Sequence, residues 1–540
     1  MVKMDVKGML LLILCLLLAF VDAGASPASP AQDPVRVEVD VSTRYQRIDG
    51  FGTSLTVGFE AFERGHFDEV VPYGVTYKLT PKQRDGILTT AVRELGVSHA
   101  RLWLWPLGIE QQNDNDDPQV MDWNAFTWAG QSGRPASSDI FDNRQNGIIE
   151  WGELLKKAVP LGLTNWILTP GRLPGWLLAR FKDPADTTKF EEYAEYAAAH
   201  VLYLKKMYRL EAPYWSMFNE PDVVGWKSAE LWIPWIKATG RRFRKEGLAT
   251  RIVFPDTAGV QEAVSLSAEV LQDPEVRQYL GALAYHHYRS SGHGPQPFVK
   301  LAAGTSKEET AKLLAQVTDG PRAMAELARR YGLPSWQTET AYYPTPVKGL
   351  SEWEIGLARA NEIHLELVSG ASAVEGMSMF WPEAVDPRYG VTVRHEGHHI
   401  VARSDGRVVR RWEVTKDAGV VFAHYGRYVR PGDWRVAAET ADPFVKATAF
   451  VSPTNDKCIV VLINNSVPSR KIVLKLKGLE WADVHQAGFV TDASRAFKPQ
   501  QVRKAGTTNS LFETTLPPKS ISTFVWSREQ VRPLRVLTGR

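Results

Sequence analysis

The sequence alternates short apolar, β-branched or aromatic segments with longer segments of helical periodicity. Eight of the short segments have the length of strands, and they cover residues 47–53, 97–105, 164–169, 214–218, 251–255, 280–288, 335–340 and 376–381. This alternation is typical of βα units that build a parallel sheet. Eight such units predict an α/β protein with a closed (β/α)8 barrel, also called a TIM barrel, rather than a doubly wound open sheet.

The helical segments lie between the predicted strands. Thr80 is a capping residue, Pro81 occupies the first helical position, and Gln83 follows three residues after the cap, so a helix is predicted to begin here. Other helices are predicted over residues 190–210, 228–245, 308–330 and 352–368.

The pattern changes after about residue 430. Short alternating runs are separated there by Pro, Asn, Gly and Asp, and they cover residues 444–451, 457–463, 470–476 and 520–526. They predict a C-terminal β-sandwich of about 100 residues. The early segment 36–41 has the same alternation, and we expect this N-terminal strand to join the sandwich.

The N-terminus has the layout of a secretory signal peptide. Lys3 and Lys7 precede an apolar run over residues 9–21, and small residues follow at 23–25. The apolar run, of about 13 residues, is too short to span a bilayer, so we expect no membrane span; a buried N-terminal helix is the alternative. The predicted divisions are a signal peptide (1–25), a flexible spacer (26–34), the joining strand (35–46), a catalytic barrel (47–429), a β-sandwich (430–527) and a tail (528–540). A secreted or periplasmic location follows from the signal peptide.

The composition excludes some classes of function. Lys and Arg together number 64 against 61 Asp and Glu, a net charge of +3, which gives no case for nucleic-acid binding. Cys15 lies in the predicted signal peptide, so Cys458 has no partner for an intrachain disulfide. The 18 Trp residues supply flat area for a large core or for stacking on ligand rings. Oligomeric state is not predicted.

Two glutamates occupy the positions where a barrel enzyme builds its site. The fourth predicted strand ends in Asn219 and Glu220, and the seventh ends in Glu339. Strands four and seven lie on roughly opposite sides of a closed barrel, so these carboxyl groups can face each other across a ligand. Glycoside hydrolysis needs such a pair, at about 5–5.5 Å for retention of configuration or about 6.5–9.5 Å for inversion.

With these residues in place, the chain resembles glycoside hydrolase family 30 and, more broadly, the retaining barrel hydrolases of clan A. The matching segments are 49–52 (Asp-Gly-Phe-Gly), 218–221 (Phe-Asn-Glu-Pro), 284–288 (Ala-Tyr-His-His-Tyr), Glu339, 380–381 (Phe-Trp) and 426–432 (Gly-Arg-Tyr-Val-Arg-Pro-Gly). They run in order through most of the predicted mature chain.

The resemblance implies a role for each matching residue. Glu220 would be the acid/base and Glu339 the nucleophile, while Asn219 would bind the 2-hydroxyl of the sugar being cleaved. Arg101 would hold the nucleophile ionised, and Tyr288 would donate a hydrogen bond to it. The substrate-binding residues that we expect in addition are His286, His287, Trp176 and Trp381. The expected partner is a β-linked carbohydrate, with no cofactor and no metal.

Some segments depart from the family pattern. Residues 169–172 (Thr-Pro-Gly-Arg) replace its Ser-Pro-Trp-Ser motif, 105–107 (Trp-Pro-Leu) replace a Gly and an Asp, and 108–146 form a long insertion. The sugar, the linkage and endo or exo action are therefore not predicted. Arg172 and Arg289 are candidates to contact an acidic sugar, and Trp103, Trp105 and Trp226 are further candidates for stacking or for the core.

Three alternative interpretations stay open. The run 395–399 (His-Glu-Gly-His-His) fits a zinc motif, but that motif requires a helix, and the alternating flanks at 391–393 and 400–402 favour a hairpin. The run 113–117 (Asn-Asp-Asn-Asp-Asp) is either a calcium site or a solvated loop. A non-catalytic carbohydrate-binding protein on a degenerate barrel is the alternative to an enzyme.

Overall fold

The computed structural model describes residues 33–55, 80–104, 110, 112–125, 148–171, 173–288, 300, 306–340, 351–376, 378–386, 391–393, 398–405, 408–479, 484–506, 510–535 and 537–539. The predicted signal peptide lies outside the described residues. None of the helices in the described ranges combines the length and the apolar character that crossing a bilayer requires.

Eight parallel strands close into a barrel in the order in which they follow along the chain. They are β2 (Gly50–Ser54), β3 (His99–Leu104), β4 (Asn165–Pro170), β5 (Tyr214–Ser216), β6 (Arg251–Thr257), β7 (Leu280–His286), β8 (Ser335–Glu339) and β9 (Ala373–Gly376). The barrel closes where β2 pairs with β9, with Gly50 opposite Ala373. The predicted barrel is confirmed.

The prediction of the eighth barrel strand is wrong. Residues 376–381 were predicted to form it, but the barrel uses β9, and β10 (Ser378–Asp386) belongs to a separate sheet. Glu375 explains the error, because a charged residue argues against a buried strand by sequence alone. In the fold Glu375 is fully buried and its carboxylate pairs with the ring of His99.

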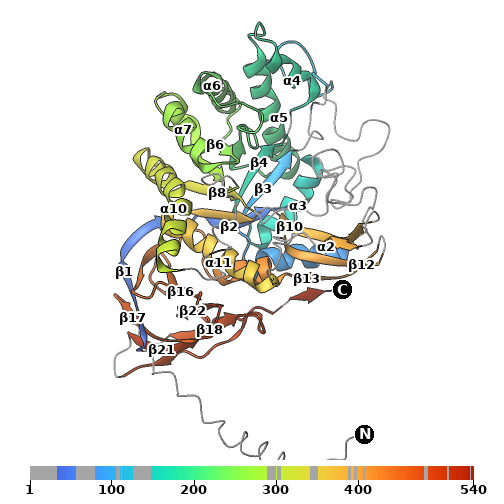
Figure 1. The fold of residues 1–540 in the computed structure, drawn as a ribbon. Coiled ribbons are helices and arrows are strands. Elements are labelled where there is room, and N and C mark those ends of the chain that lie inside the picture. The colour runs from blue at the N-terminus through green and yellow to red at the C-terminus, as the bar shows by residue number, and fades with distance from the viewer. Residues whose placement is uncertain are drawn as a thin grey trace, which may run out of the picture.

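Helices surround the barrel (Figure 1). They are α2 (Pro81–Thr89), α3 (Ile148–Leu161), α4 (Gly175–Lys182), α5 (Lys189–Tyr208), α6 (Ala229–Lys245), α7 (Val260–Val270), α8 (Val276–Tyr279), α10 (Lys307–Arg330), α11 (Glu352–Ser369) and α12 (Val421–Gly426). Two π-helical segments, η2 (Thr90–Leu95) and η5 (Lys416–Val420), precede β3 and α12. The predicted start of α2 is confirmed: Thr80 Oγ1 accepts from the Gln83 amide at 3.2 Å, and Gln83 Oε1 accepts from the Thr80 amide at 2.8 Å.

Side chains fill the interior of the barrel. A separate cluster of buried residues from different strands packs there, made of Ile167, Val253, Ala282, Ala284, Trp336 and Ala373. Trp336 is fully buried, and its indole nitrogen donates to Asp49 Oδ2 at 2.8 Å. The barrel is therefore a packed core, as this architecture requires, and polar residues at the strand ends rest on an apolar floor.

A ten-stranded, mostly antiparallel sheet forms the second layer. Its strands are β1 (Val35–Arg47), β14 (Trp434–Thr440), β15 (Val445–Val451), β16 (Lys457–Asn464), β17 (Arg470–Lys477), β18 (His485–Thr491), β19 (Lys498–Pro499), β20 (Arg503–Lys504), β21 (Leu511–Leu516) and β22 (Ser520–Ser527). The sheet curls as a sandwich does, because Phe512 of β21 and Trp526 of β22 meet with ring centroids 5.0 Å apart. The predicted sandwich is confirmed.

The N-terminal strand lies inside this sheet, as predicted. β1 pairs antiparallel with β14 and parallel with β17, and Figure 1 shows it running from the barrel into the red strands. Val37, Val39 and Val41 of β1 are buried in the core of the sheet. The first described strand therefore links the barrel to a sheet that otherwise comes from the C-terminal part of the chain.

A five-stranded sheet was not predicted. Its order is β11 (Val391–Val393), β10, β12 (His398–Asp405), β13 (Val408–Val414) and β23 (Thr538–Gly539). The expected hairpin is wrong, because β11 and β12 pair with opposite edges of β10 and not with each other. Residues 394–397 lie outside the described residues, whereas His398 and His399 are buried in a strand rather than on the helix that the zinc motif requires.

Removing β1 tests its structural role. Burial of three valines stabilises the fold by about 5 kcal/mol, and their loss also exposes the edges of β14 and β17. We expect a chain that begins at residue 48 to unfold at lower temperature and to aggregate, relative to a control chain that begins at residue 33. Equal melting temperature and equal solubility of the two chains would contradict this role.

Candidate active site

The two predicted glutamates meet at the carboxyl ends of the strands. Glu220 follows β5 and Glu339 ends β8. One carboxylate oxygen of each and a ring nitrogen of His286 lie within 4.8 Å of one another. This close approach places the two carboxyl groups where both can reach one bound sugar, as paired carboxyl groups in glycoside hydrolysis must.

Glu339 is held by donors on both of its oxygens. Arg101 Nη1 donates to Oε2, and the hydroxyl of Tyr288 donates to Oε1 at 2.9 Å. The side chain of Glu339 is only 4% exposed and that of Arg101 is fully buried. The carboxylate is thereby fixed in one orientation, with its negative charge next to a guanidinium group.

Glu220 is more open to solvent. Its side chain is 25% exposed. Its backbone is left-handed, with φ of 50°, and its amide donates to the carbonyl of Asp256 at 3.0 Å. This conformation costs a non-glycine residue roughly 1–2 kcal/mol, so the surrounding hydrogen bonds have to hold it in place.

Asp256 connects the groups of the site. Its carboxylate accepts from Arg101 Nη2 and from Ser216 Oγ, both at 2.8 Å, and from Thr338 Oγ1 at 2.6 Å. His286 Nε2 lies 3.2 Å from its second oxygen. Asp256 was not predicted as a site residue, although it is a charged residue directly after the apolar segment 251–255.

His286 lies between the acidic groups. Its Nδ1 is 3.2 Å from Glu220 Oε1, while its Nε2 faces Asp256. Burial alone would lower the pKa of His286, but the charges of Glu339 and Asp256 and the hydrogen bonds to Asp256 and Glu220 raise it to about 10. His286 is therefore a cation at neutral pH, with a proton directed at Glu220.

The two glutamates differ in their pKa. Burial raises the pKa of Glu339, and the positive charges of His286 and Arg101 only partly oppose this. Burial acts in the same direction on Glu220, but the hydrogen bond and the charge of His286 outweigh it and lower the pKa of Glu220. In the absence of ligand the proton next to Glu220 therefore resides on His286.

Of the other predicted site residues, some lie beside the two glutamates and others do not. Asn219 joins the site, because its Oδ1 accepts from Arg101 Nη2 at 2.7 Å. His287 is buried and its Nδ1 pairs with Glu366, behind the two glutamates. Trp176 on α4 is half-buried, and its indole nitrogen donates to the carbonyl of Glu110 at 2.9 Å. Trp381 lies in β10, and its side chain, like Trp105, Arg172 and Arg289, is outside the described residues.

Two groups of the described residues have the spacing of metal ligands. One is Glu220, His286 and Glu339, but the guanidinium of Arg101 already neutralises Glu339 and would repel a second cation. The other is Glu110 and Asp114, which follow β3, with Glu195 on α5.

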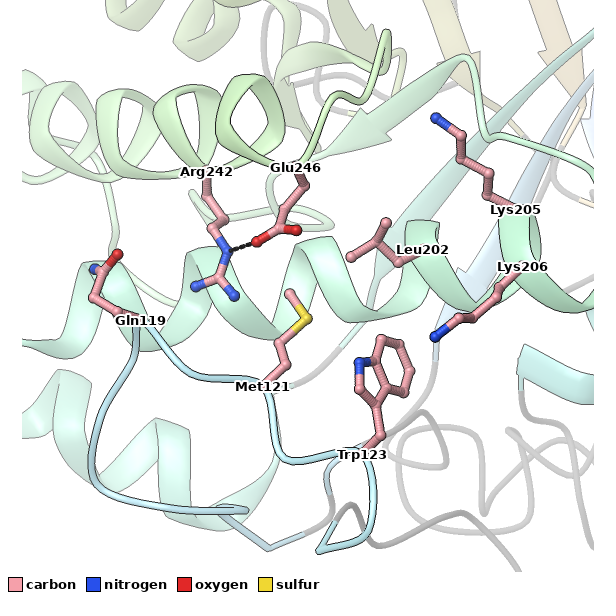
Figure 2. A pocket seen from close by; sticks show the side chains of 8 residues that line it. All are labelled: Gln119, Met121, Trp123, Leu202, Lys205, Lys206, Arg242 and Glu246. Carbon is pink, nitrogen blue, oxygen red and sulfur yellow. Dashed lines mark hydrogen bonds and ion pairs between the residues drawn. The ribbon is translucent and has the colours of Figure 1, made fainter.

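A cavity of about 450 Å³ lies away from these strand ends. The segment 119–123 and the ends of α5 and α6 line it, and Figure 2 shows Arg242 bonded to Glu246 on one wall and Trp123 beside Lys206 on the other. Helices of a βα barrel run opposite to the strands, so the ends of α5 and α6 lie at the face remote from the glutamates. This cavity is not the candidate active site.

Solved structures share the fold. Over 91% of the chain it is similar to a glycoside hydrolase family 30 endoxylanase from Clostridium papyrosolvens, which is covered completely, at 20% identity and a TM-score of 0.57. The catalytic domain of a family 30 xylanase C from Talaromyces cellulolyticus, also covered completely, matches 91% of the chain at 18% identity and a TM-score of 0.61. An endo-β1,6-glucanase, of which 95% is covered, matches 93% of the chain at 18% identity and a TM-score of 0.61.

No family model matches the sequence, and no curated protein is significantly similar to it. The structural matches therefore establish the architecture, a barrel with a sandwich built partly from the N-terminal strand. What the site does has to be argued from its own residues.

Replacing Asp256 tests the charge network. In Asp256→Asn the buried cations Arg101 and His286 lose their shared counter-ion, and removing one partner from a buried network costs about 3–5 kcal/mol. We expect the free energy of unfolding, measured with urea, to fall by that amount. The matched control is Asp85→Asn on the surface, where the pair with Lys157 is half exposed and the loss stays under about 1 kcal/mol. Equal losses in the two variants would contradict the role of Asp256.

Proposed function

We propose that this protein is a secreted retaining glycoside hydrolase that cleaves β-glycosidic bonds in a polysaccharide or glycoconjugate. The observation that carries the proposal is the approach of the Glu220 and Glu339 carboxylates to within 4.8 Å at the end of a barrel. Among the proteins with the same fold are xylanases and an endo-β1,6-glucanase, which supports a carbohydrate substrate.

Glu339 is proposed as the nucleophile. Its Oε2 and Oε1 receive hydrogen bonds from Arg101 and Tyr288, which orient the carboxylate and oppose the rise in pKa that burial causes. An oxygen of Glu339 attacks the anomeric carbon as the bond to the leaving oxygen breaks, which gives a glycosyl ester on the enzyme. Water then attacks the same carbon from the face that the leaving group vacated, and the carboxylate is released with overall retention.

Glu220 is proposed as the acid/base. It gives a proton to the leaving oxygen in the first step and takes one from the attacking water in the second. Its exposed position, with 25% of the side chain accessible, suits contact with both water and substrate. Because the resting proton resides on His286, transfer from Nδ1 to Glu220 Oε1 across 3.2 Å produces the acid that the first step uses.

Asn219, Trp176 and Trp381 are proposed to bind the sugar. The amide of Asn219 accepts from Arg101 through its oxygen, which leaves its NH2 group to donate to a hydroxyl of the substrate. His287 was also predicted to bind the substrate; because its buried ring pairs with Glu366, we propose instead that it supports the site without contacting the sugar. Export through the N-terminal segment 1–25 is part of the same proposal.

Replacing the two glutamates tests the chemistry. We expect Glu339→Gln and Glu220→Gln each to lower kcat/KM on the best glycan of a screen by at least about 1,000-fold, since each removes a group that acts in the transition state. The control Glu230→Gln alters an exposed glutamate on α6 and should keep full activity.

The stereochemical outcome is measured on the wild-type protein. Proton NMR of the first anomer released should show retention. Inversion would exclude the covalent mechanism. Glycan binding without any release of reducing ends would identify the alternative, a non-catalytic carbohydrate-binding protein.

The pH profile tests the role of His286. In the wild type the His286–Glu220 pair keeps its last proton up to a pKa of about 10. In His286→Gln the proton for the leaving oxygen can come only from the carboxyl group of Glu220, which loses it at lower pH than the imidazole does. The alkaline limb of kcat/KM should therefore move to lower pH by more than about one unit. His287→Gln is the matched control, because His287 bonds to Glu366 and should leave that limb in place. An unmoved alkaline limb in His286→Gln would show that the proton does not come from this pair.

A further inference from the structure

A second group of carboxylates lies outside the candidate active site. Glu110 follows β3, Asp114 lies four residues further along, and Glu195 projects from α5. One oxygen of each of these three carboxylates lies within 4.8 Å of the others. Glu192, one turn before Glu195 on α5, is buried beside them.

Glu110 is the exceptional member of this group. Its side chain is fully buried, and apart from a proton shared with Asp114 no donor of the described residues reaches its carboxylate oxygens. Its φ of 68° places it in the left-handed region, which costs a non-glycine residue roughly 1–2 kcal/mol. A buried carboxylate without a donor is strongly unfavourable unless a proton or a cation neutralises it.

The neighbouring arginines do not supply that charge. Arg180 lies 3.2 Å from Glu192 and also pairs with Asp186, while Arg242 lies 3.6 Å from Glu195 and bonds more closely to Glu246. In the part of the chain that the structure describes, no Lys or Arg forms an ion pair with Glu110. Burial, then the charges of Glu195 and Asp114, and then a hydrogen bond with Asp114 raise the pKa of Glu110 to about 10. Without a bound cation Glu110 is therefore protonated at neutral pH, and a cation that binds here takes the place of that proton.

We propose that Glu110, Asp114 and Glu195 bind a calcium ion. Ca²⁺ takes hard oxygen ligands at about 2.3–2.6 Å in flexible geometry. Two oxygens bound to one such ion are at most about 5 Å apart, which the mutual separation of these three carboxylate oxygens satisfies. The Oδ1 of Asn113, the residue before Asp114, is also buried, and no donor of the described residues reaches it.

The ion joins an inserted loop to the barrel. Asp114 Oδ2 already accepts from the amide of Asp122 at 2.6 Å, so the segment 112–125 is folded around this carboxylate. Glu195 anchors the ion to α5, and the carbonyl of Glu110 accepts from the indole of Trp176. The calcium ion thereby fixes both the loop and the orientation of an aromatic residue that we propose to contact the substrate.

Calcium binding is measured directly on the full chain. The protein is treated with EDTA, dialysed, and titrated with CaCl2 or MgCl2 by calorimetry, and its melting temperature is recorded with each ion. We expect one Ca²⁺ per chain, a rise in melting temperature of several degrees with calcium, and a much weaker response to magnesium. Terbium provides a second readout, since Trp176 is close enough to sensitise its luminescence.

Two variants localise the site. Glu110→Gln should lower calcium affinity at least tenfold, and Asp114→Asn provides the same test if Glu110→Gln fails to fold. Asp116→Asn is the matched control, because that carboxylate is fully exposed and should leave affinity unchanged within twofold. Absence of calcium binding, preference for magnesium, or unchanged affinity in both Glu110→Gln and Asp114→Asn would overturn the proposal. The calcium test does not measure glycosidase activity. Its outcome is therefore independent of whether the proposed function is correct.

Discussion

The candidate active site depends on the buried carboxylate of Asp256. It binds the guanidinium of Arg101 and the ring of His286, and hydroxyls from β5 and β8 complete its hydrogen bonds. Burying a charge is costly unless partners neutralise it, so these contacts fix the strand ends relative to one another. Because Arg101 also reaches Glu339 and His286 also reaches Glu220, the position of each glutamate follows from one shared anchor.

The barrel provides what this anchor needs. Asp256, Arg101, His286 and Glu339 come from four different strands, and only closure of the sheet brings those strands into one ring. An apolar floor that includes Trp336 lies within the barrel and keeps water from the charges from that side. The curled sheet has a different role: through β1 it joins the start of the barrel to the C-terminal part of the chain.

The sequence predicts the regular strands and helices of this fold better than it predicts the buried charged residues and the pairing of distant strands. Periodicity locates the strands of the barrel except the last, and the end of each strand identifies Glu220 and Glu339 as candidates. Glu375 obscures the eighth strand, since hydropathy treats every carboxylate as exposed and cannot anticipate its partner His99. Asp256 was missed for the same reason, because its importance depends on four partners that are distant in the sequence. The five-stranded sheet depends on pairing across β10, which local patterns do not encode.

The buried carboxylates around Asp256 and those around Glu110 are neutralised in different ways. In the candidate active site, Arg101 and protonated His286 lie among Asp256, Glu220 and Glu339, so protein cations balance most of the charge. Around Glu110 the arginines Arg180 and Arg242 pair with Glu192 and Glu195, and among the described residues no Lys or Arg pairs with Glu110 itself. A catalytic site needs a charge that can be relocated within one turnover, and a histidine meets that need. A loop that is fixed to the barrel needs a positive charge that does not move, and a bound divalent ion supplies it.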